Sequence, residues 1–190
     1  MSAPRYHHEK TYPKPITAEH LYTMPEDPFY ELYSGVLMVR EPGGYVHSDV
    51  EVTLTSLLKP YARQHKLGKI FSGSLGYVIS RNPDTVLAPD ASFIRQERLL
   101  YGSAAFKFFE GAPDLAVEVM SPSNRFTSMQ RKAGLYLAAG TSIVWIIRPK
   151  DQTTVVMRKD GTMTLIPADG MLDGEDVIPG FSCSLASLFE

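Results

Sequence analysis

The sequence is short of three features that mark large classes of protein: cysteine, long apolar runs and excess positive charge. Its 190 residues include a single cysteine, Cys183, which excludes an internal disulfide and a cysteine-based zinc site. This cysteine usage favours a reducing compartment, so we expect a cytoplasmic protein. The first residues lack the apolar run of a signal peptide, and no stretch approaches the roughly 20 apolar residues that span a bilayer.

The charge balance and the absence of two motifs exclude further classes. The formal net charge is −2, whereas a protein that coats nucleic acid through its overall charge is expected to be basic. Any contact with nucleic acid must therefore come from a local patch. No Gly-x-Ser-x-Gly element supplies a nucleophilic serine, and residues 73–76, Gly-Ser-Leu-Gly, lack the spacing of a phosphate-binding loop.

The residues that are present suit one globular domain. Hydrophobic residues make up 44% and charged residues 21%, which is ordinary globular composition. A chain of this length can bury a core without disulfides or metal ions. Residues 1–16 are rich in proline and predict a loose N-terminal arm that includes His7 and His8. We expect residues 17–190 to form a single domain.

The spacing of apolar residues predicts three helices. Thr17 is a suitable N-cap for a short helix that Pro25 ends. Residues 47–61 have apolar side chains at helical spacing, with Pro60 in the last turn, where it should end or kink the helix. Residues 128–139 form the third predicted helix.

Apolar runs and alternating patterns predict strands between these helices. Residues 184–189 are interpreted as a short helix or a docking tail. The order of elements predicts an α/β fold, a mixed β-sheet flanked by helices with a hairpin near each end. The expected strands cover residues 69–80, 86–94, 115–120 and 143–147, and the expected hairpins cover residues 30–39 and 153–166.

Two acidic residues fall on strands that are expected to be neighbours. Because side chains alternate between the faces of a strand, Asp90 shares a face with Ser92, and Glu118 shares a face with Ala116. If these faces coincide, two carboxylates meet at one point. A buried carboxylate is costly unless it is paired or binds a metal ion, and Mg²⁺ takes one or two carboxylates together with waters and phosphate. Asp90 and Glu118 are therefore candidate magnesium ligands.

A lysine on the following helix is the third candidate. Lys132 lies three residues after Met129 and four before Tyr136, at the border of the apolar face of that helix. Its side chain either extends into solvent or reaches the two carboxylates over the strand ends. In the second arrangement its charge can orient an attacking water and offset the charge that builds on a phosphate.

These residues, in this order, resemble the PD-(D/E)XK nuclease superfamily and, within it, the Uma-type restriction endonuclease family. The superfamily commonly has lysine two residues after the glutamate, where this chain has Met120, whereas the Uma-type branch has it on the following helix. The matching motifs, over about residues 29–149, are Tyr30-Glu31-Leu32 with Gly35, His47, Pro89-Asp90, Gly111-Ala112-Pro113-Asp114-Leu115, Val117-Glu118-Val119 with Ser121-Pro122-Ser123, Lys132 with Tyr136, Ala139-Gly140, and Trp145.

The resemblance implies a restriction-endonuclease-like fold and an enzyme that hydrolyses DNA phosphodiester bonds with Mg²⁺ or Mn²⁺. It also implies a homodimer. It assigns Asp90, Glu118 and Lys132 to the catalytic site, with Asp90 and Glu118 as metal ligands, and adds Glu31 as a further acidic member.

Three other residues are candidates for binding the substrate: His47, Ser121 and Arg125. The histidine can contact phosphate or carry a proton, and the serine hydroxyl and the arginine can meet the DNA backbone. The chain departs from the family pattern at Ser128, where the family often has an acid four residues before the helix lysine. A second departure is Arg148, which precedes a proline where the family often has aspartate.

Each candidate also has a purely structural interpretation. Asp90 suits a strand end, Glu118 suits a buried ion pair, and Lys132 suits a solvated helix face. Two other functions therefore stay open at this point. One is a catalytically inactive endonuclease-fold module for nucleic-acid binding or assembly, favoured by the net charge and by Ser128. The other is a metal-dependent hydrolase of small phosphate esters.

Overall fold

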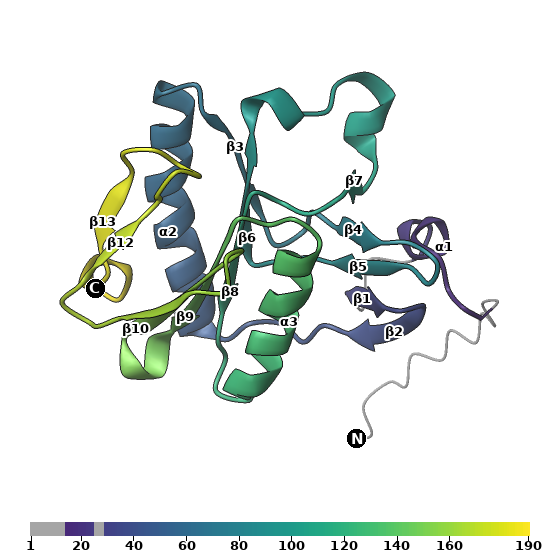
Figure 1. The fold of residues 1–190 in the computed structure, drawn as a ribbon. Helices are drawn as coiled ribbons and strands as arrows, with labels where there is room; N and C mark the ends of the chain where they lie inside the picture. The colour runs from purple at the N-terminus through teal and green to yellow at the C-terminus, as the bar shows by residue number, and fades with distance from the viewer. Residues whose placement is uncertain (1–13, 25–28) are drawn as a thin grey trace.

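The computed structural model describes residues 14–24 and 29–190, and a six-stranded mixed sheet forms its centre (Figure 1). The middle strand, β8, consists of buried residues throughout, as expected for a strand covered on both faces. It runs parallel to β9 and antiparallel to β6. In order across the sheet, the strands are β11 (Met163–Ile166), β10 (Thr153–Arg158), β9 (Ile143–Arg148), β8 (Leu115–Val119), β6 (Ala91–Arg95) and β3 (Gly68–Ser72).

Two helices cover opposite faces of this sheet. Val117 of β8 packs in one buried cluster with residues of α2 (Tyr45–Gln64), whereas Ala116 packs in another with residues of α3 (Phe126–Ala138). This alternation follows the two-residue period of a strand. Glu118 therefore falls on the face that α3 covers.

A second, five-stranded sheet carries the N-terminal hairpin. Leu32, Val78 and Val86 from three of its strands form one buried cluster with Leu21 of α1 (Ala18–Tyr22). Figure 1 places this sheet and α1 to the right of α3. In order across the sheet, the strands are β2 (Val36–Val39), β1 (Tyr30–Tyr33), β5 (Thr85–Leu87), β4 (Tyr77–Ser80) and β7 (Phe109–Glu110).

Two segments predicted as continuous strands are each divided between the two sheets. The prediction for residues 69–80 is wrong because β3 and β4 belong to different sheets and Gly73 lies in the segment that joins them. The prediction for residues 86–94 is wrong for the same reason, since β5 and β6 are separated. Pro89 lacks the N–H that a ladder needs, and the chain passes from one sheet to the other at Asp90.

The three predicted helices are present with shifted bounds. Thr17 caps α1 as predicted, and its side-chain oxygen accepts a hydrogen bond from the His20 N–H at 3.3 Å. Pro25 lies outside the described residues. α2 continues past Pro60, so of the two predicted effects of this proline, an end or a kink of the helix, the first is wrong. Ala62, one of the next residues, is buried in the core, and this packing stabilises the last turn.

Both predicted hairpins are present. In the first, Ser34 and Gly35 have φ angles of 49° and 77°, the left-handed values that a two-residue hairpin turn requires. The predicted arm, with its two histidines, lies outside the described residues as far as residue 13. Ile16, which we assigned to that arm, is buried, and its N–H donates to the Gly35 carbonyl at 3.1 Å.

Short elements complete the fold, and one of them lies in the segment that was predicted to be a short helix or a docking tail. Residues 184–189 form the end of a strand and a 3₁₀ turn, and Leu188 is buried in the core cluster that includes α2. Among the described residues, no helix is both long enough and apolar enough to cross a membrane. The short elements are β12 (Met171–Asp173), β13 (Ser182–Ser184) and the 3₁₀ helices η1 (Gln96–Arg98), η2 (Gly102–Phe106), η3 (Pro149–Asp151) and η4 (Ala186–Leu188).

A pair of leucines on α2 tests the assignment of its inner face. Leu54 is 0% exposed, whereas Leu57 on the same helix is 37% exposed. We expect Leu54→Ala to lower the free energy of unfolding by about 2–5 kcal/mol, because it leaves a cavity. Leu57→Ala should cost clearly less. Urea denaturation followed by circular dichroism measures both, and equal losses would contradict this packing.

Candidate active site

Asp90 lies where the chain leaves one sheet for the other. The β6–β8 register pairs Ala91 with Val117, and extending it by one residue places Asp90 opposite Glu118. The backbone N–H of Val119 donates to Asp90 Oδ2 at 2.7 Å. This bond holds the Asp90 carboxylate over the end of β8. β6, which Asp90 directly precedes, and β8, which carries Glu118, are therefore neighbours, as the sequence analysis expected.

Glu118 forms a buried ion pair with the helix lysine. Lys132 Nζ lies 2.8 Å from Glu118 Oε1 and 3.0 Å from Glu118 Oε2. The hydroxyl of Tyr136 donates to Glu118 Oε1 at 3.1 Å. Lys132 and Tyr136 are four residues apart on α3, so both lie on the face that meets the sheet. The border of the apolar face of α3, where Lys132 lies, therefore faces the protein interior. The Lys132 side chain is only 8% exposed.

The same lysine reaches the second sheet. Lys132 Nζ lies 2.8 Å from Oε1 of Glu31, a residue of β1. Glu31 Oε1 also accepts from the Ala88 N–H at 2.9 Å, and Glu31 Oε2 accepts from the Tyr33 hydroxyl at 3.0 Å. Glu31 is therefore held in place by β1 and by the segment that leads to Asp90.

Burial and charge act in opposite directions on these groups. Burial raises the pKa of Glu118, and the neighbouring Asp90 and Glu31 raise it further, while Lys132 lowers it. The net pKa of Glu118 lies above its usual range. Burial lowers the pKa of Lys132, but the attraction of Glu118 and Glu31 outweighs burial and raises it. Lys132 therefore keeps its positive charge inside the protein.

Asp90 has cationic neighbours of its own. Arg40 forms an ion pair with Asp90 Oδ1, and His47 Nε2 lies 3.1 Å from Asp90 Oδ2. Burial raises the pKa of Asp90, but the bond to His47, the charge of Arg40 and the Val119 N–H together lower it. The bond to Asp90 raises the pKa of His47 against the effect of burial. Asp90 is consequently the more acidic of the two carboxyl groups.

Two residues near Asp90 were missed by the sequence analysis. Arg40 follows the exposed strand β2 and belongs to no motif, so no sequence signal marked it. Glu51 lies four residues after His47 on α2, and that spacing was a usable signal. Ligand atoms of His47, Glu51 and Asp90 all lie within 4.8 Å of one another.

One cleft of about 440 Å³ is lined by six of the seven sequence-predicted site residues: Glu31, His47, Asp90, Glu118, Ser121 and Lys132. The Ser121 hydroxyl lies 3.0 Å from that of Ser123. Arg125 is exposed at the N-cap of α3 and does not line the cleft. Met120 packs in the apolar cluster beneath α3. The structure therefore brings together every predicted site residue except Arg125.

The donors at this cleft suit a divalent cation. Asp90 and Glu118 both present carboxylate oxygens, the ligands that Mg²⁺ and Mn²⁺ accept. Two neighbouring buried carboxylates also need positive charge nearby, and here Arg40 and Lys132 provide part of it. Asp90 and Glu118 are the residues that would hold such an ion.

Comparison with known families and structures identifies the family and the fold of the chain. A family model with the description "Uma2: Putative restriction endonuclease" matches residues 18–186, most of the chain. The chain belongs to the Uma2 family. The family resemblance inferred from the sequence motifs is thereby confirmed. No curated protein matches this Uma2 chain.

The Uma2 chain is also similar to a solved crystal structure, that of "a putative nuclease belonging to DUF820 from Anabaena variabilis ATCC 29413". The two share 22% sequence identity with a TM-score of 0.81, and the match covers 92% of this chain and 97% of that chain. A likeness at this identity shows the fold alone. The predicted restriction-endonuclease-like α/β fold, with helices on a mixed sheet and a hairpin near each end, is confirmed.

Removal of the buried lysine of this Uma2 chain should show how strongly its two buried carboxylates, without a cation, lower the free energy of unfolding. Lys132→Met leaves Glu31 and Glu118 without their cation, so we expect a loss of about 3–5 kcal/mol in the free energy of unfolding near neutral pH. A buried carboxyl with a raised pKa is destabilising only when it is ionised. The loss should therefore be larger at about pH 8 than at about pH 5.

Urea denaturation at both pH values measures this loss. The matched control is Arg131→Met, which removes an exposed cation from the neighbouring position of α3 and should change stability by less than about 0.5 kcal/mol. A loss that does not depend on pH would contradict the role of Lys132 as the partner of two ionised carboxylates.

Proposed function

We propose that the protein is a divalent-metal-dependent endonuclease that hydrolyses DNA phosphodiester bonds. The observation that carries this proposal is the convergence of Asp90, Glu118 and Lys132 on one cleft at the junction of two sheets. Membership of the Uma2 family supports it independently. Fold alone would not, because one fold serves many functions.

Asp90 and Glu118 are the proposed ligands of Mg²⁺ or Mn²⁺. Bound between their carboxylates, the ion would polarise a phosphoryl oxygen and lower the pKa of a water molecule. Lys132 keeps a positive charge beside Glu118, where it can orient the attacking water and offset the negative charge that builds on the phosphate. Glu31 holds the Lys132 ammonium from the opposite sheet, so we propose that it positions the lysine.

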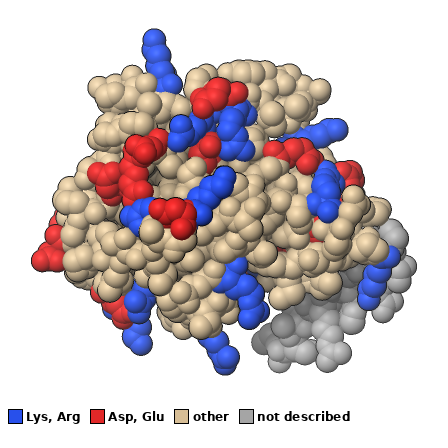
Figure 2. All heavy atoms as spheres, in the orientation of Figure 1, with Lys and Arg blue, Asp and Glu red and all other residues tan. Residues whose placement is uncertain are grey.

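DNA is the proposed substrate, and local groups must supply its contacts. Positive and negative side chains are intermixed on the face shown in Figure 2, in keeping with the net charge of −2. Ser121 on the cleft wall and Arg125, which follows the cleft residue Asn124, are proposed to bind the phosphate backbone. The sequence also makes His47 a candidate for this role. The homodimer and the cytoplasmic location stay predictions.

A non-catalytic endonuclease-fold module is the second candidate. Two observations favour it. Ser128 is exposed where the family often has an acid, and Arg40 holds the carboxylate of Asp90 that a metal ion would need. The two candidates differ in one measurable property, the cleavage of DNA.

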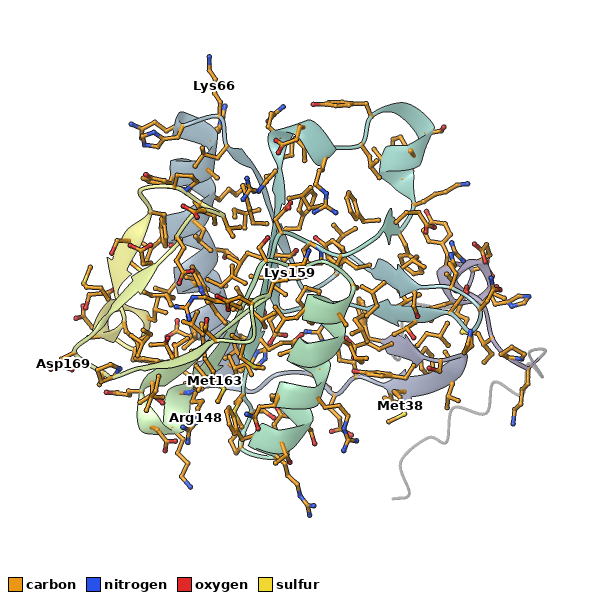
Figure 3. All side chains as sticks on the ribbon, viewed as in Figure 1. Met38, Lys66, Arg148, Lys159, Met163 and Asp169 are labelled. Atoms are coloured by element: carbon orange, nitrogen blue, oxygen red, sulfur yellow. The ribbon has the colours of Figure 1, made fainter. Side chains whose placement is uncertain are left out.

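Cleavage of plasmid DNA with Mg²⁺ or Mn²⁺ tests the proposal. We expect the wild type to nick or linearise the plasmid and Asp90→Asn and Glu118→Gln each to be at least about 100-fold slower, because each loses a carboxylate that would hold the metal ion. The matched control is Asp169→Asn, since Asp169 is exposed at the edge of the molecule (Figure 3). If the wild type cuts nothing, or if all variants cut equally, the endonuclease proposal fails.

The salt dependence of DNA binding tests Arg125. Each phosphate contact contributes about 0.9 to the slope of log K against log salt for duplex DNA. Arg125→Ala should therefore reduce that slope by about 0.9, measured by fluorescence anisotropy without divalent metal. Arg63→Ala, at the exposed end of α2, is the control and should leave the slope unchanged. An unchanged slope for Arg125→Ala would remove this residue from the interface.

A further inference from the structure

α2 brings two further metal-ligating side chains to Asp90. His47 and Glu51 are four residues apart, so both lie on the helix face that meets the junction of the sheets. His47 Nε2 lies 3.1 Å from Asp90 Oδ2, and ligand atoms of all three residues lie within 4.8 Å of one another. The group comprises one imidazole nitrogen and two carboxylates, contributed by a helix and by the strand junction.

The orientation of the His47 ring determines which of its two nitrogens can bind a metal ion. Nδ1 is buried and has no hydrogen-bond partner among the described residues, and it lies against Gly43, where an added Cβ would be 2.4 Å from it. Nε2 points to Asp90. Nε2 is therefore the nitrogen that can bind an ion shared with Asp90 and Glu51.

The charges around the junction are not balanced. The carboxylates of Glu31, Glu118, Asp90 and Glu51 are accompanied by two permanent cations, Lys132 and Arg40. With His47 neutral, two negative charges are left, which is the charge that one divalent cation neutralises. One of these two charges remains beside α2, because Arg40 pairs with Asp90 while Lys132 pairs with Glu31 and Glu118.

Glu51 is the source of the uncompensated charge beside α2. No cationic side chain in the described part of the chain forms an ion pair with it. It is only partly exposed, and burial and the nearby Asp90 both raise its pKa. A metal ion bound by both Glu51 and Asp90 would stabilise a carboxylate in this position.

We propose that His47, Glu51 and Asp90 bind a divalent metal ion through His47 Nε2 and one oxygen of each carboxylate. The inference rests on the proposed function because the two share Asp90, and it changes the role of His47 from a phosphate contact to a metal ligand. Imidazole suits transition metals, whereas Mg²⁺ favours oxygen ligands. The site should accordingly bind Mn²⁺ more tightly than Mg²⁺.

Binding of Mn²⁺ to the full-length chain, without DNA, tests the inference. Isothermal titration calorimetry measures the affinity, and pulsed electron paramagnetic resonance detects nitrogen directly bonded to Mn²⁺. We expect His47→Gln and Glu51→Gln each to weaken Mn²⁺ binding about tenfold or more. Nitrogen coupling should be present in the wild type and in Glu51→Gln at saturating Mn²⁺, and absent in His47→Gln.

Matched controls on the same helix separate a ligand from a general change in charge. Asp49→Asn removes an exposed carboxylate two residues from Glu51, and His65→Gln removes an exposed imidazole at the end of α2. Both should keep the wild-type affinity and the nitrogen coupling. If Mn²⁺ binds without nitrogen coupling, or if Glu51→Gln binds as tightly as Asp49→Asn, the inference is overturned.

Two outcomes distinguish this inference from the proposed function. Mn²⁺-dependent DNA cleavage that is lost in Asp90→Asn, with no nitrogen coupling on the bound ion, would overturn the His47–Glu51 site and leave the endonuclease proposal standing. Nitrogen-coordinated Mn²⁺ in a protein that cuts no DNA would support the site and contradict the endonuclease proposal.

Discussion

The buried ammonium of Lys132 is the interaction on which the rest of the site depends. It lies 2.8 Å from carboxylate oxygens of both Glu31 and Glu118, and these belong to different sheets. Removing charges from water is costly, and a buried pair is tolerated only with close geometry and further hydrogen bonds. Tyr33, Tyr136 and the Ala88 N–H provide those bonds. The ammonium of Lys132 on α3 therefore links the two sheets beside the cleft through its ion pairs with both carboxylates.

The junction at Asp90 is the second constraint. Pro89 interrupts the ladder, so the chain leaves the five-stranded sheet after β5 and enters the six-stranded sheet at β6. Asp90 is consequently not part of a continuous strand face, and its two oxygens are available to groups from several directions: the Val119 N–H, His47 and Arg40. A position that is reached from both a helix and a neighbouring strand is well suited to collecting ligands.

The family assignment and the site geometry answer different questions. The family match and the structural likeness establish which fold the chain has and which proteins it belongs with. The chemistry follows from named side chains in one cleft, because function depends on the site and not on the fold that carries it. Arg40 illustrates the difference. None of the sequence motifs quoted above includes it, yet it pairs with the carboxylate on which both the endonuclease proposal and the metal-site proposal depend.

The sequence by itself predicted the α/β class, three helices, both hairpins and the apolar central strand in which Glu118 is the only charged residue. It could do so because local periodicity and turn residues determine these features. It left open whether the Lys132 side chain extends into solvent or reaches the carboxylates, and only the family resemblance assigned this lysine to the site. It could not show that residues 69–80 and 86–94 divide between two sheets, because apolar alternation is the same in either sheet. Only the tertiary structure brought Arg40 and Glu51 to Asp90, because contacts between residues so distant in sequence depend on how the helix and both sheets pack together.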